Sequence, residues 1–423
     1  MTRKEDAHVS FNELGIGPEL LAALAERNFA HPTPIQRDVI PIALKGADVV
    51  GIAETGTGKT LAFGVPMLER LMTRGGQGLI LLPTRELALQ VDEVLQKFGQ
   101  KLGLRTAVLI GGASMHTQLK MLREKPHIVI ATPGRLADHL RQKSYALTQI
   151  KIIVLDEADR MFDIGFLPEI KRILSAAPSE RQTMLFSATM PSAIAEIAVR
   201  HMRSPLRIEV ARAGTAAANV KHEIYVVAKD AKMQLLDKLL ADNPGTVLVF
   251  SRTKHGAKKI AAGVRAMGHT AAEIHSNRSL AQRRAALEGF KHGTYRVLVA
   301  TDIAARGIDV RGIAFVVNYD LPSTPEDYVH RIGRTGRAGA SGSAISFATV
   351  DQKGDVRQIE RLIQKTIPRV ELPVLPPRRA PIDMPIATGQ SRRSGVRSGR
   401  KSHEFSRFRH QKNNGRRRGF RRQ

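Results

Sequence analysis

The sequence predicts an α/β protein with two parallel-sheet domains in tandem, followed by a basic segment that has no core of its own. Short, apolar, β-branched runs alternate with segments of helical length, and this alternation occurs twice along the 423 residues. Such runs are typical of strands buried on both faces, as in parallel sheets covered by helices. The length exceeds what one small core accommodates, and it therefore favours two domains with an additional segment.

The expected strands follow from these apolar runs. In the first half they lie at 49–53, 78–82, 106–110, 127–131, 151–155 and 182–186, and in the second at 246–250, 295–300, 313–318 and 343–348. Between the halves, the small and polar residues 210–220 show no periodicity, which indicates a flexible linker. The expected boundaries are an N-terminal segment at 9–37, a first domain at 38–209, the linker at 210–220, a second domain at 221–370 and a tail at 371–423.

Charge and composition restrict the class of protein. Hydrophobic residues make up 42% of the chain, no apolar run approaches the length of a membrane span, and the charged start does not resemble a signal peptide. The chain has no cysteine, which excludes disulfides and thiolate metal sites and fits a reducing compartment. We therefore expect a cytoplasmic protein. The formal net charge of +27 makes a polyanion the first partner to consider.

Much of this charge is concentrated at the C-terminal end. Residues 391–423 contain 13 Lys or Arg and a single acid, Glu404, with too few apolar residues to form a core. The segment is therefore predicted to be disordered and to add affinity for nucleic acid without reading its sequence. The alternative is a tail that serves solubility alone.

A phosphate-binding loop is predicted directly after the first strand. The segment AETGTGKT precedes a helical pattern, as a P-loop requires, with Lys59 reaching the β- and γ-phosphates and Thr60 binding Mg²⁺. The general pattern begins with Gly where this chain has Ala53, so the closest approach to phosphate depends on Gly56 and Gly58. The alternative is a chance glycine-rich turn. The predicted nucleotide-binding positions of the loop are Ala53, Glu54, Thr55, Gly56, Thr57, Gly58, Lys59 and Thr60.

The run KIIVLDEADRMFD supplies the second half of such a site, because an apolar strand ends directly in carboxylates. Asp156 is predicted to order Mg²⁺, and Glu157 to accept a proton from the attacking water. Nucleotide and Mg²⁺ would balance the charge of these acids. A solvated loop at a strand end is the alternative, which is less convincing for a pair of acids than for one.

At this point the sequence resembles a known family. Residues 156–159 spell DEAD, and the flanking DEADRMFDIGF and RQTMLFSATMP are similar to the RhlE-type branch of the bacterial DEAD-box RNA helicases. The resemblance extends from about Val9 to Leu362. It implies that both domains are RecA-like, that ATP and Mg²⁺ are the cofactors, and that RNA, as a single strand or short duplex, is the partner. We expect a monomer without membrane association, and ribosomal-precursor or messenger RNA complexes are candidate targets.

The resemblance also implies roles for individual residues. In FAHPTPIQ, Gln36 would read the adenine edge, with Phe11 and Phe29 as candidate aromatic partners of the base. Without the resemblance, Gln36 and Phe29 would be ordinary helix-start and core residues. Residues that would link the phosphate site to domain movement are Asp159, Ser187, Thr189 and His330.

The second domain contributes HRIGRTGRAG, whose arginines explain why two domains are needed. Guanidinium groups supplied from another domain stabilise the charge on the γ-phosphate during its transfer. By resemblance these groups belong to Arg334 and Arg337, while Arg331 and His330 would organise interdomain contacts. Asp309 would approach the nucleotide across the cleft. A solvated basic loop is the alternative.

The remaining motifs indicate a nucleic-acid strand that crosses both domains. They follow predicted strands, at the edge where open α/β sheets bind ligands, and offer hydroxyls, backbone N–H groups and Arg to a sugar-phosphate backbone. Asp302 and Arg306 are expected to be structural or switch-like. Where the family has a Ser-Gln-x-x-Arg pattern, Arg283 matches but Leu280 replaces Gln. The predicted RNA-binding residues are Pro83, Thr84, Arg85, Gly112, Thr132, Arg135, Arg252 and Thr301.

The predicted function is an ATP-dependent RNA helicase that separates short duplexes or remodels RNA–protein complexes. Aromatic residues are only 4% of the chain, and the absence of an aromatic base-stacking motif favours binding without sequence preference. The histidines lack metal-ligand spacing, so no structural zinc is expected. Two alternatives stay open, a DNA helicase and an ATP-gated RNA clamp or annealing protein that does little unwinding.

Overall fold

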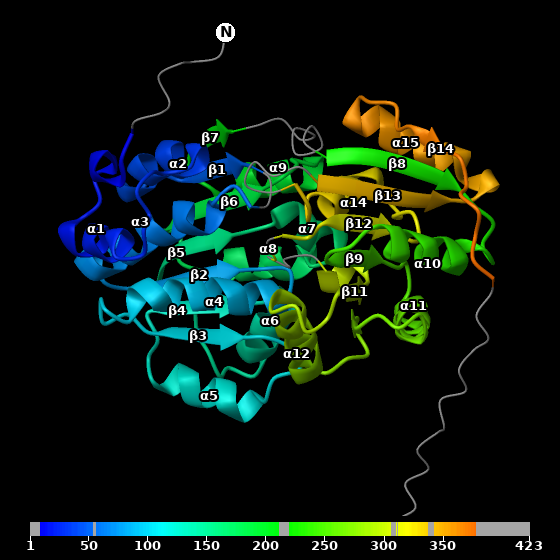
Figure 1. Cartoon of the computed structure of the whole chain (residues 1–423). Helices are drawn as coiled ribbons and strands as arrows, with labels where there is room; N and C mark the ends of the chain where they lie inside the picture. Colours follow the sequence, from blue (N-terminus) through cyan, green and yellow to red (C-terminus); the bar gives the residue numbers. More distant parts are fainter. Residues whose placement is uncertain are drawn as a thin grey trace, which may run out of the picture. The chain divides into compact units, whose positions relative to one another are not determined.

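Two seven-stranded sheets of parallel strands form the framework of the protein in this computed structural model (Figure 1). The strand order is β3-β4-β2-β5-β6-β1-β7 in the first sheet and β10-β11-β9-β12-β13-β8-β14 in the second. The structure describes residues 9–53, 56–210, 220–305, 310, 312–336 and 342–377. The linker at 211–219 and the tail beyond 377 lie outside these ranges.

The strands of the first sheet are β1 (Val49–Ile52), β2 (Gln77–Leu81), β3 (Thr106–Leu109), β4 (Ile128–Ala131), β5 (Ile150–Leu155), β6 (Gln182–Ser187) and β7 (Leu206–Glu209). Those of the second are β8 (Val220–Val226), β9 (Val247–Phe250), β10 (Ala271–Ile274), β11 (Val297–Ala300), β12 (Phe315–Asn318), β13 (Gly342–Ala348) and β14 (Arg369–Val370). Each run that we expected as a strand forms one, with ends that differ by one or two residues. The predicted fold of two tandem RecA-like domains is confirmed.

Helices connect the strands. In the first half they are η1 (Phe11–Leu14), α1 (Pro18–Ala25), α2 (Pro34–Leu44), α3 (Lys59–Arg74), α4 (Arg85–Gly99), α5 (Met115–Arg123), α6 (Pro133–Arg141), α7 (Ala158–Asp163), α8 (Leu167–Ala176) and α9 (Ser192–His201). In the second they are α10 (Lys232–Asp242), α11 (Lys254–Ala266), α12 (Leu280–Lys291), α13 (Asp302–Ala305), α14 (Pro325–Ile332), η3 (Val350–Gln352) and α15 (Lys353–Ile363). None of the described helices has the length and hydropathy needed to span a membrane.

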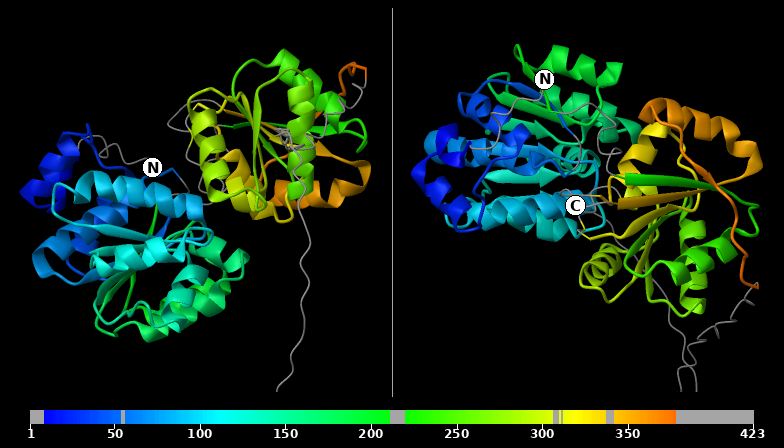
Figure 2. Two further views of the ribbon diagram at one scale, coloured as in Figure 1. Left: turned by 90° about the horizontal axis from the view of Figure 1, so that it is seen from below. Right: turned by 45° about the horizontal axis from the view of Figure 1, so that its top comes forward.

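The first sheet is buried on both faces because its strands alternate between two apolar clusters. In β5, Ile152 and Val154 face the cluster beneath α3 and α4, whereas Ile153 and Leu155 face the cluster beneath α8 and α9. This alternation follows from the two-residue period of a strand. Figure 2 shows the strands of this sheet between two layers of helices. Continuous apolar runs therefore predicted these strands correctly.

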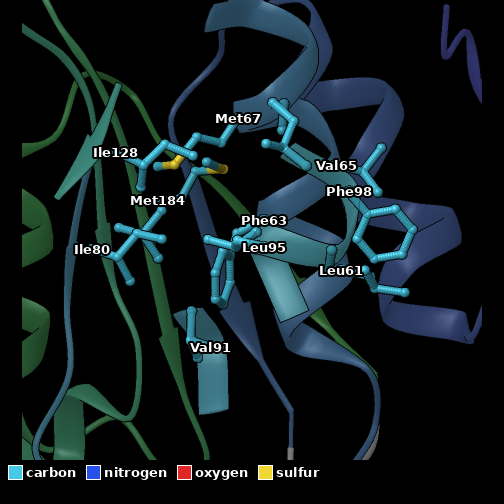
Figure 3. Close-up of a cluster of buried hydrophobic side chains, with 14 of the residues drawn as sticks. Leu61, Phe63, Val65, Met67, Ile80, Val91, Leu95, Phe98, Ile128 and Met184 are labelled. Carbon is cyan, nitrogen blue, oxygen red and sulfur yellow. The ribbon is translucent and has the colours of Figure 1, made fainter. Parts of the chain in front are cut away.

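Side chains of α3, α4 and the sheet converge in the first of these clusters (Figure 3). Phe63 is fully buried in it, and its ring centroid lies 5.5 Å from that of Phe186 on β6. Val91 and Leu95 of α4 belong to the same cluster and are almost completely buried. This packing fixes the helix that follows the phosphate-binding loop against the sheet.

The second sheet repeats the arrangement. Val247 and Val249 of β9 face one cluster, whereas Leu248 and Phe250 face another. The second domain also extends past residue 370, where we placed its end. Leu375 packs against the first of these two clusters, and the Pro376 carbonyl accepts a hydrogen bond of 2.6 Å from Gln234 Nε2.

The strand order determines where chemistry can occur. Strands β5, β6 and β1 are neighbours, and all of them are parallel, so their carboxyl ends lie at one edge of the first sheet. The segments that follow these strands contain the predicted phosphate loop, the acids after 155 and the Ser187–Thr189 segment. Three motifs that are far apart in the sequence are therefore brought together by topology.

We expect Phe63→Ala to lower the free energy of unfolding of the first domain by about 3–5 kcal/mol, because it leaves a cavity among close-packed side chains. Urea denaturation followed by circular dichroism measures this loss. Phe162→Ala is the matched control, since Phe162 is 37% exposed and its loss should cost less than about 1 kcal/mol. Equal losses for both variants would contradict the assignment of Phe63 to the core.

Candidate active site

The phosphate-binding loop leads into α3 through backbone that only glycine adopts easily. Gly56 and Gly58 have φ values of 87° and 92°, in the left-handed region. The Gln36 amide donates a hydrogen bond of 2.9 Å to the Gly58 carbonyl, and a Cβ added at Gly58 would lie 2.4 Å from Gln36 Nε2. Gln36 thus supports the loop directly. Two other residues of the loop, Glu54 and Thr55, lie outside the described residues.

Ala53, which stands where the general pattern has Gly, fits its position. Its side chain is buried, and Ala53 is not one of the described residues whose backbone φ is positive. Its carbonyl accepts a hydrogen bond of 3.1 Å from Lys59 Nζ. The backbone at Ala53 therefore does not need glycine, and its carbonyl holds the lysine at the end of β1.

The acids after β5 lie beside this lysine. Lys59 Nζ is 3.8 Å from Asp156 Oδ1, and both side chains are about 5% exposed. Asp156 Oδ1 also accepts a hydrogen bond of 2.9 Å from the Glu157 backbone N–H. Burial raises the pKa of Asp156 to about 6, although the Lys59 ammonium acts in the opposite direction.

Glu157 is buried and held in an uncommon backbone conformation. Its φ is 51°, a left-handed value that carries strain in a residue other than glycine. Burial raises the pKa of its carboxyl, and the charges of Lys59 and Arg334 oppose that rise. A carboxyl with a raised pKa in such a site is suited to accept a proton near neutral pH.

Asp159 links the acids to the end of β6. Its Oδ2 accepts hydrogen bonds from the backbone N–H groups of Ala188 and Thr189, at 3.1 and 2.9 Å, and from the Thr189 hydroxyl at 3.0 Å. The Asp159 backbone N–H donates to Ser187 Oγ at 3.1 Å. The structure therefore brings together three of the residues that we expected to couple the site to movement.

The second domain supplies Arg334 and His330. Arg334 is 3% exposed, its Nε donates a hydrogen bond of 3.2 Å to the His330 carbonyl, and its charge acts on Glu157. Burial lowers the pKa of His330 to about 4 against the opposing charge of Asp159, so its ring is neutral at physiological pH. Arg337 and Asp309, predicted from the same motifs, lie outside the described residues.

Arg331 has a different role from the interdomain one that we expected. Its guanidinium pairs with both carboxylate oxygens of Asp302, at 2.5 and 2.8 Å, and donates to Asn318 Oδ1 at 3.1 Å. It also lies over the Phe250 ring, 4.9 Å from the centroid. All these partners belong to the second domain, so Arg331 fixes that domain's own elements, and Asp302 is structural as expected.

The two candidate aromatic partners of a base differ in exposure. Phe11 is only 3% exposed and belongs to the core cluster of the first domain, because η1 turns it toward α2. Phe29 is 40% exposed and lies 6.1 Å from Phe98, measured between ring centroids. Of the two, only Phe29 offers an accessible ring.

The predicted RNA-binding residues follow strand ends in both domains. The Thr84 hydroxyl caps α4 by accepting from the Leu87 N–H at 3.3 Å, and the Arg85 guanidinium lies against Gly111 and Gly112. Pro83 precedes Thr84, and Thr132 directly precedes α6. Arg135 Nη1 donates to the Ala113 carbonyl at 3.3 Å, and Arg252 Nη2 donates to the Leu321 carbonyl at 3.2 Å. The Thr301 N–H donates to the Ile274 carbonyl at 3.3 Å.

One positioning residue was missed by the sequence analysis. Asp320 Oδ2 accepts from the Arg252 backbone N–H at 3.1 Å and from Ser251 Oγ at 3.3 Å, and Oδ1 accepts from Lys232 Nζ at 3.3 Å. The carboxylate therefore holds the segment after β9 in place. An acid two residues beyond the expected strand at 313–318 was the available signal.

Together, parallel sheets, a phosphate-binding loop, and a Lys–Asp–Glu cluster at adjoining strand ends define a P-loop nucleoside triphosphatase with two RecA-like domains. The family model described as DEAD/DEAH box helicase matches residues 33–197, and the model described as Helicase conserved C-terminal domain matches residues 231–339. The chain belongs to the DEAD/DEAH box helicase family, whose members use ATP.

Individual relatives agree with this assignment. The chain is 42% identical over 369 residues to the DEAD-box ATP-dependent RNA helicase CshA of Bacillus cereus, covering 86% of this chain and 70% of the relative. It is similar to the structure of S. cerevisiae Dbp5 bound to RNA and ADP BeF3, with 31% identity, a TM-score of 0.77, and coverage of 86% and 96%. A structure of Mss116p bound to ssRNA and AMP-PNP has 27% identity, a TM-score of 0.79, and coverage of 87% and 80%. The RhlE-type branch stays a prediction.

The raised pKa of Asp156 predicts a pH-dependent stability for the nucleotide-free protein. Because its pKa is about 6 in the folded state against 3.8 ordinarily, the folded protein binds this proton more tightly than the unfolded chain. The contribution to stability is therefore present at low pH and is lost as pH rises from about 4 to about 6, by up to roughly 3 kcal/mol.

Urea unfolding of wild type and Asp156→Asn between pH 4.5 and 7 tests this prediction. The variant lacks the titrating group, so its stability relative to wild type should increase over this range and then level off. A difference between the two proteins that stays constant with pH would contradict the assignment.

Proposed function

We propose that this protein is an ATP-dependent RNA helicase that binds RNA without sequence preference and opens short duplexes or remodels RNA–protein complexes. The observation that carries the proposal is the cluster of Lys59, Asp156 and Glu157 at adjoining strand ends, with the charge of Arg334 acting on it. Catalytic groups shared between two domains make hydrolysis depend on how those domains meet. The similar structures that hold RNA and a nucleotide analogue support this proposal.

Binding of ATP would exchange the contacts that Lys59 now makes. Its ammonium donates to the Ala53 carbonyl and lies near Asp156, so it is already close to where the loop would hold phosphates. Gln36 would contact both the adenine edge and the loop, since it already bonds to Gly58. Phe29 is the favoured partner for the base because its ring is accessible.

Mg²⁺ fits the residues present. A buried carboxylate with a raised pKa, as Asp156 has, gains from a nearby cation that offsets the cost of its burial. Among the described residues there is no group of three or more His, Cys, Asp or Glu that could hold a metal. Mg²⁺ typically takes one or two protein ligands and completes its shell with phosphates and water, which suits Asp156 with Thr60. When bound, it would neutralise charge on the phosphates.

Glu157 would accept the proton of the attacking water, and Arg334 would stabilise charge on the γ-phosphate. Arg337 as a second such arginine and Asp309 as a nucleotide contact rest on the sequence resemblance. Asp159 would transmit the state of the site through Ser187 and Thr189, since it bonds to both. His330, neutral in this environment, would meet that cluster from the second domain.

The RNA strand would run along the motif loops after the strands of both sheets. Thr84, Arg85, Gly112, Thr132, Arg135, Arg252 and Thr301 offer hydroxyls, backbone N–H groups and guanidinium groups, which bind sugar and phosphate without reading bases. The tail would add affinity that falls with salt. We further propose that the protein acts as a monomer in the cytoplasm, in keeping with a chain that contains no cysteine.

Glu157→Gln should slow RNA-stimulated ATP hydrolysis by roughly 10²–10⁴ while nucleotide stays bound, because the amide cannot accept the proton. Phosphate release and fluorescent-nucleotide binding measure the two effects. Glu169→Gln on α8 serves as the control. Normal turnover in Glu157→Gln would show that another group acts as the base.

Strand separation by the wild-type protein, measured in parallel with ATP hydrolysis, distinguishes a helicase from a clamp, which would hydrolyse ATP without opening duplexes.

Arg334→Ala should lower RNA-stimulated turnover by about 10³ or more, the range for losing an arginine that stabilises phosphoryl transfer. Binding of ATP, which depends on the first domain, should change little. Arg200→Ala is the matched control, because Arg200 is 68% exposed on α9. Steady-state hydrolysis with and without RNA checks the outcome, and stimulation that persists in Arg334→Ala would refute the shared site.

A further inference from the structure

Helix α5 buries a single residue, and that residue is polar. Gln118 is 1% exposed, and the other residues of α5, all of which the structure describes, are half-buried or exposed. A buried amide is costly unless its donors and its acceptor are hydrogen-bonded. An apolar side chain would pack at this position without that cost, so the presence of an amide indicates a specific hydrogen-bonding role.

The amide of Gln118 donates to the loop around Gly112, one of the predicted RNA-binding residues. Its Nε2 lies 3.1 Å from the Ile110 carbonyl and 3.4 Å from the carbonyls of Ala113 and Ser114. These carbonyls lie before and after Gly112 in the chain. One buried amide therefore contacts the backbone on both sides of this glycine.

His139 of α6 holds the oxygen of this amide. Its ring is completely buried, and its Nε2 lies 3.2 Å from Gln118 Oε1. Because the N–H groups of the amide face carbonyls, its oxygen faces the imidazole, and Nε2 must carry the proton of this hydrogen bond. Burial and then the charge of Arg135 lower the pKa of His139, against the opposing charge of Asp138, so the ring is neutral near pH 7. The Ser144 hydroxyl, 2.8 Å from Nδ1, is placed to donate to it.

Arg135 contacts the same loop from the same helix. Arg135 and His139 are four residues apart on α6 and therefore lie on one face of it. Arg135 Nη1 donates to the Ala113 carbonyl at 3.3 Å, and Gln118 Nε2 contacts this same carbonyl. Arg135, in the first turn of α6, is itself a predicted RNA-binding residue. One hydrogen-bond network therefore joins the loop to the first turn of α6.

The loop can bind phosphate only while its backbone N–H groups are aimed correctly, because a hydrogen bond weakens steeply as its angle falls. Gly112 has a φ of 77°, and a Cβ added there would lie 2.3 Å from Arg85 Nη1. The Arg85 guanidinium and the Gln118 amide thus both contact this loop. Together they restrict how far it can turn.

We propose that Gln118 and His139 are positioning residues that set the spacing between two RNA-binding segments, the loop at Gly112 and the start of α6 at Arg135. Contacts to successive phosphates fix the register of a strand, so the segments that make them must be held at a matching distance. Neither positioning residue touches RNA, since both are buried. All members of the network belong to the first domain. The inference rests on the proposed function and deepens it.

Gln118→Met tests the amide, because methionine keeps the length of the side chain and lacks its donors and acceptor. The dissociation constant for a labelled single-stranded RNA, measured by fluorescence anisotropy with a non-hydrolysable ATP analogue, should rise by about three- to tenfold, the cost of one or two hydrogen bonds. The rate of ATP hydrolysis at saturating RNA should stay within about twofold of wild type, since the phosphate site is not changed. A general packing defect would instead lower that rate and leave the RNA affinity of the folded protein unchanged. Unchanged RNA affinity in the folded variant would overturn the proposal.

The imidazole is tested by a pair of variants. His139→Gln places an amide N–H close to where Nε2 now donates, whereas His139→Leu has no donor. RNA affinity should fall in His139→Leu as far as in Gln118→Met, and in His139→Gln it should stay within about twofold of wild type. Equal losses in the Leu and Gln variants would overturn the role of the imidazole.

A double variant tests whether the two residues act together. Gln118→Met combined with His139→Leu should bind RNA no more weakly than the weaker of the single variants, because both changes break the same chain of hydrogen bonds. Losses that multiply in the double variant would show two independent effects and would overturn the network.

Tyr145→Phe is the matched control. The Tyr145 hydroxyl donates to Gln77 Oε1 at the start of β2, the end of the strand opposite to the predicted RNA-binding loops. The change removes a hydrogen bond between side chains of the same domain and should leave RNA affinity unchanged. A loss equal to that of Gln118→Met would show that any such defect weakens RNA binding, and would overturn the proposal.

Folding and the proposed function are checked separately. Thermal unfolding identifies a variant that fails to fold, and in that case Ser144→Ala, at a half-buried position at the outer end of the network, decides the question. Its RNA affinity should fall by about two- to threefold, and unchanged affinity would count against the network. Absence of RNA binding by the wild-type protein would instead refute the proposed function.

Discussion

The burial of two carboxylates at the end of β5 is the constraint on which the rest of the structure depends. Asp156 and Glu157 both have raised pKa values because burial disfavours their charged forms. Only nearby positive charge makes such a site tolerable, and the first domain supplies one ammonium, Lys59, at 3.8 Å. In this structure the Arg334 guanidinium of the second domain adds its charge beside Glu157 and opposes the rise of the pKa of that carboxyl. Carboxyl groups with raised pKa values that lie beside specific positive charges are typical of functional centres.

Parallel topology makes the arrangement possible. All strands of each sheet are parallel, so their carboxyl ends lie at one edge of the sheet. Each domain therefore presents several loops at that edge, where open α/β sheets bind ligands. In the first domain Asp159 joins two of these loops through the N–H groups of Ala188 and Thr189. In the second, Arg331 joins α13, β12 and α14 through Asp302 and Asn318. In each domain one buried side chain thus connects several of the loops that follow the strands.

Much of this could be predicted from sequence, and the exceptions have physical reasons. The phosphate loop and the acids were evident because their chemistry requires contiguous residues after a strand. Strands β7, β8, β10 and β14 were not predicted. Strand β10 was missed because Ala271–Ile274 lacks β-branched residues before Ile274 and contains the buried acid Glu273. The hydrogen bond of 2.7 Å from Arg283 Nη2 on α12 to Glu86 Oε2 on α4 could not be predicted, since it joins residues 197 apart in the sequence. Arg331 was assigned to the interface because a motif shows which residues recur, and not which way each side chain points.

Helices α4 and α12 are joined by one buried ion pair, Glu86–Arg283, and by Leu280, which packs against the core of the first domain. A fully buried leucine contributes about 1.5–3 kcal/mol, and Leu280, only partly buried, contributes less. About 1.4 kcal/mol changes an equilibrium tenfold, so one such side chain contributes modestly to the contact between the two helices. The chain has a formal net charge of +27, so its own positive charges repel one another in the compact state. The acids Glu86 and Glu93 of α4 lie near bases of α12 and offset part of this repulsion where the two helices meet.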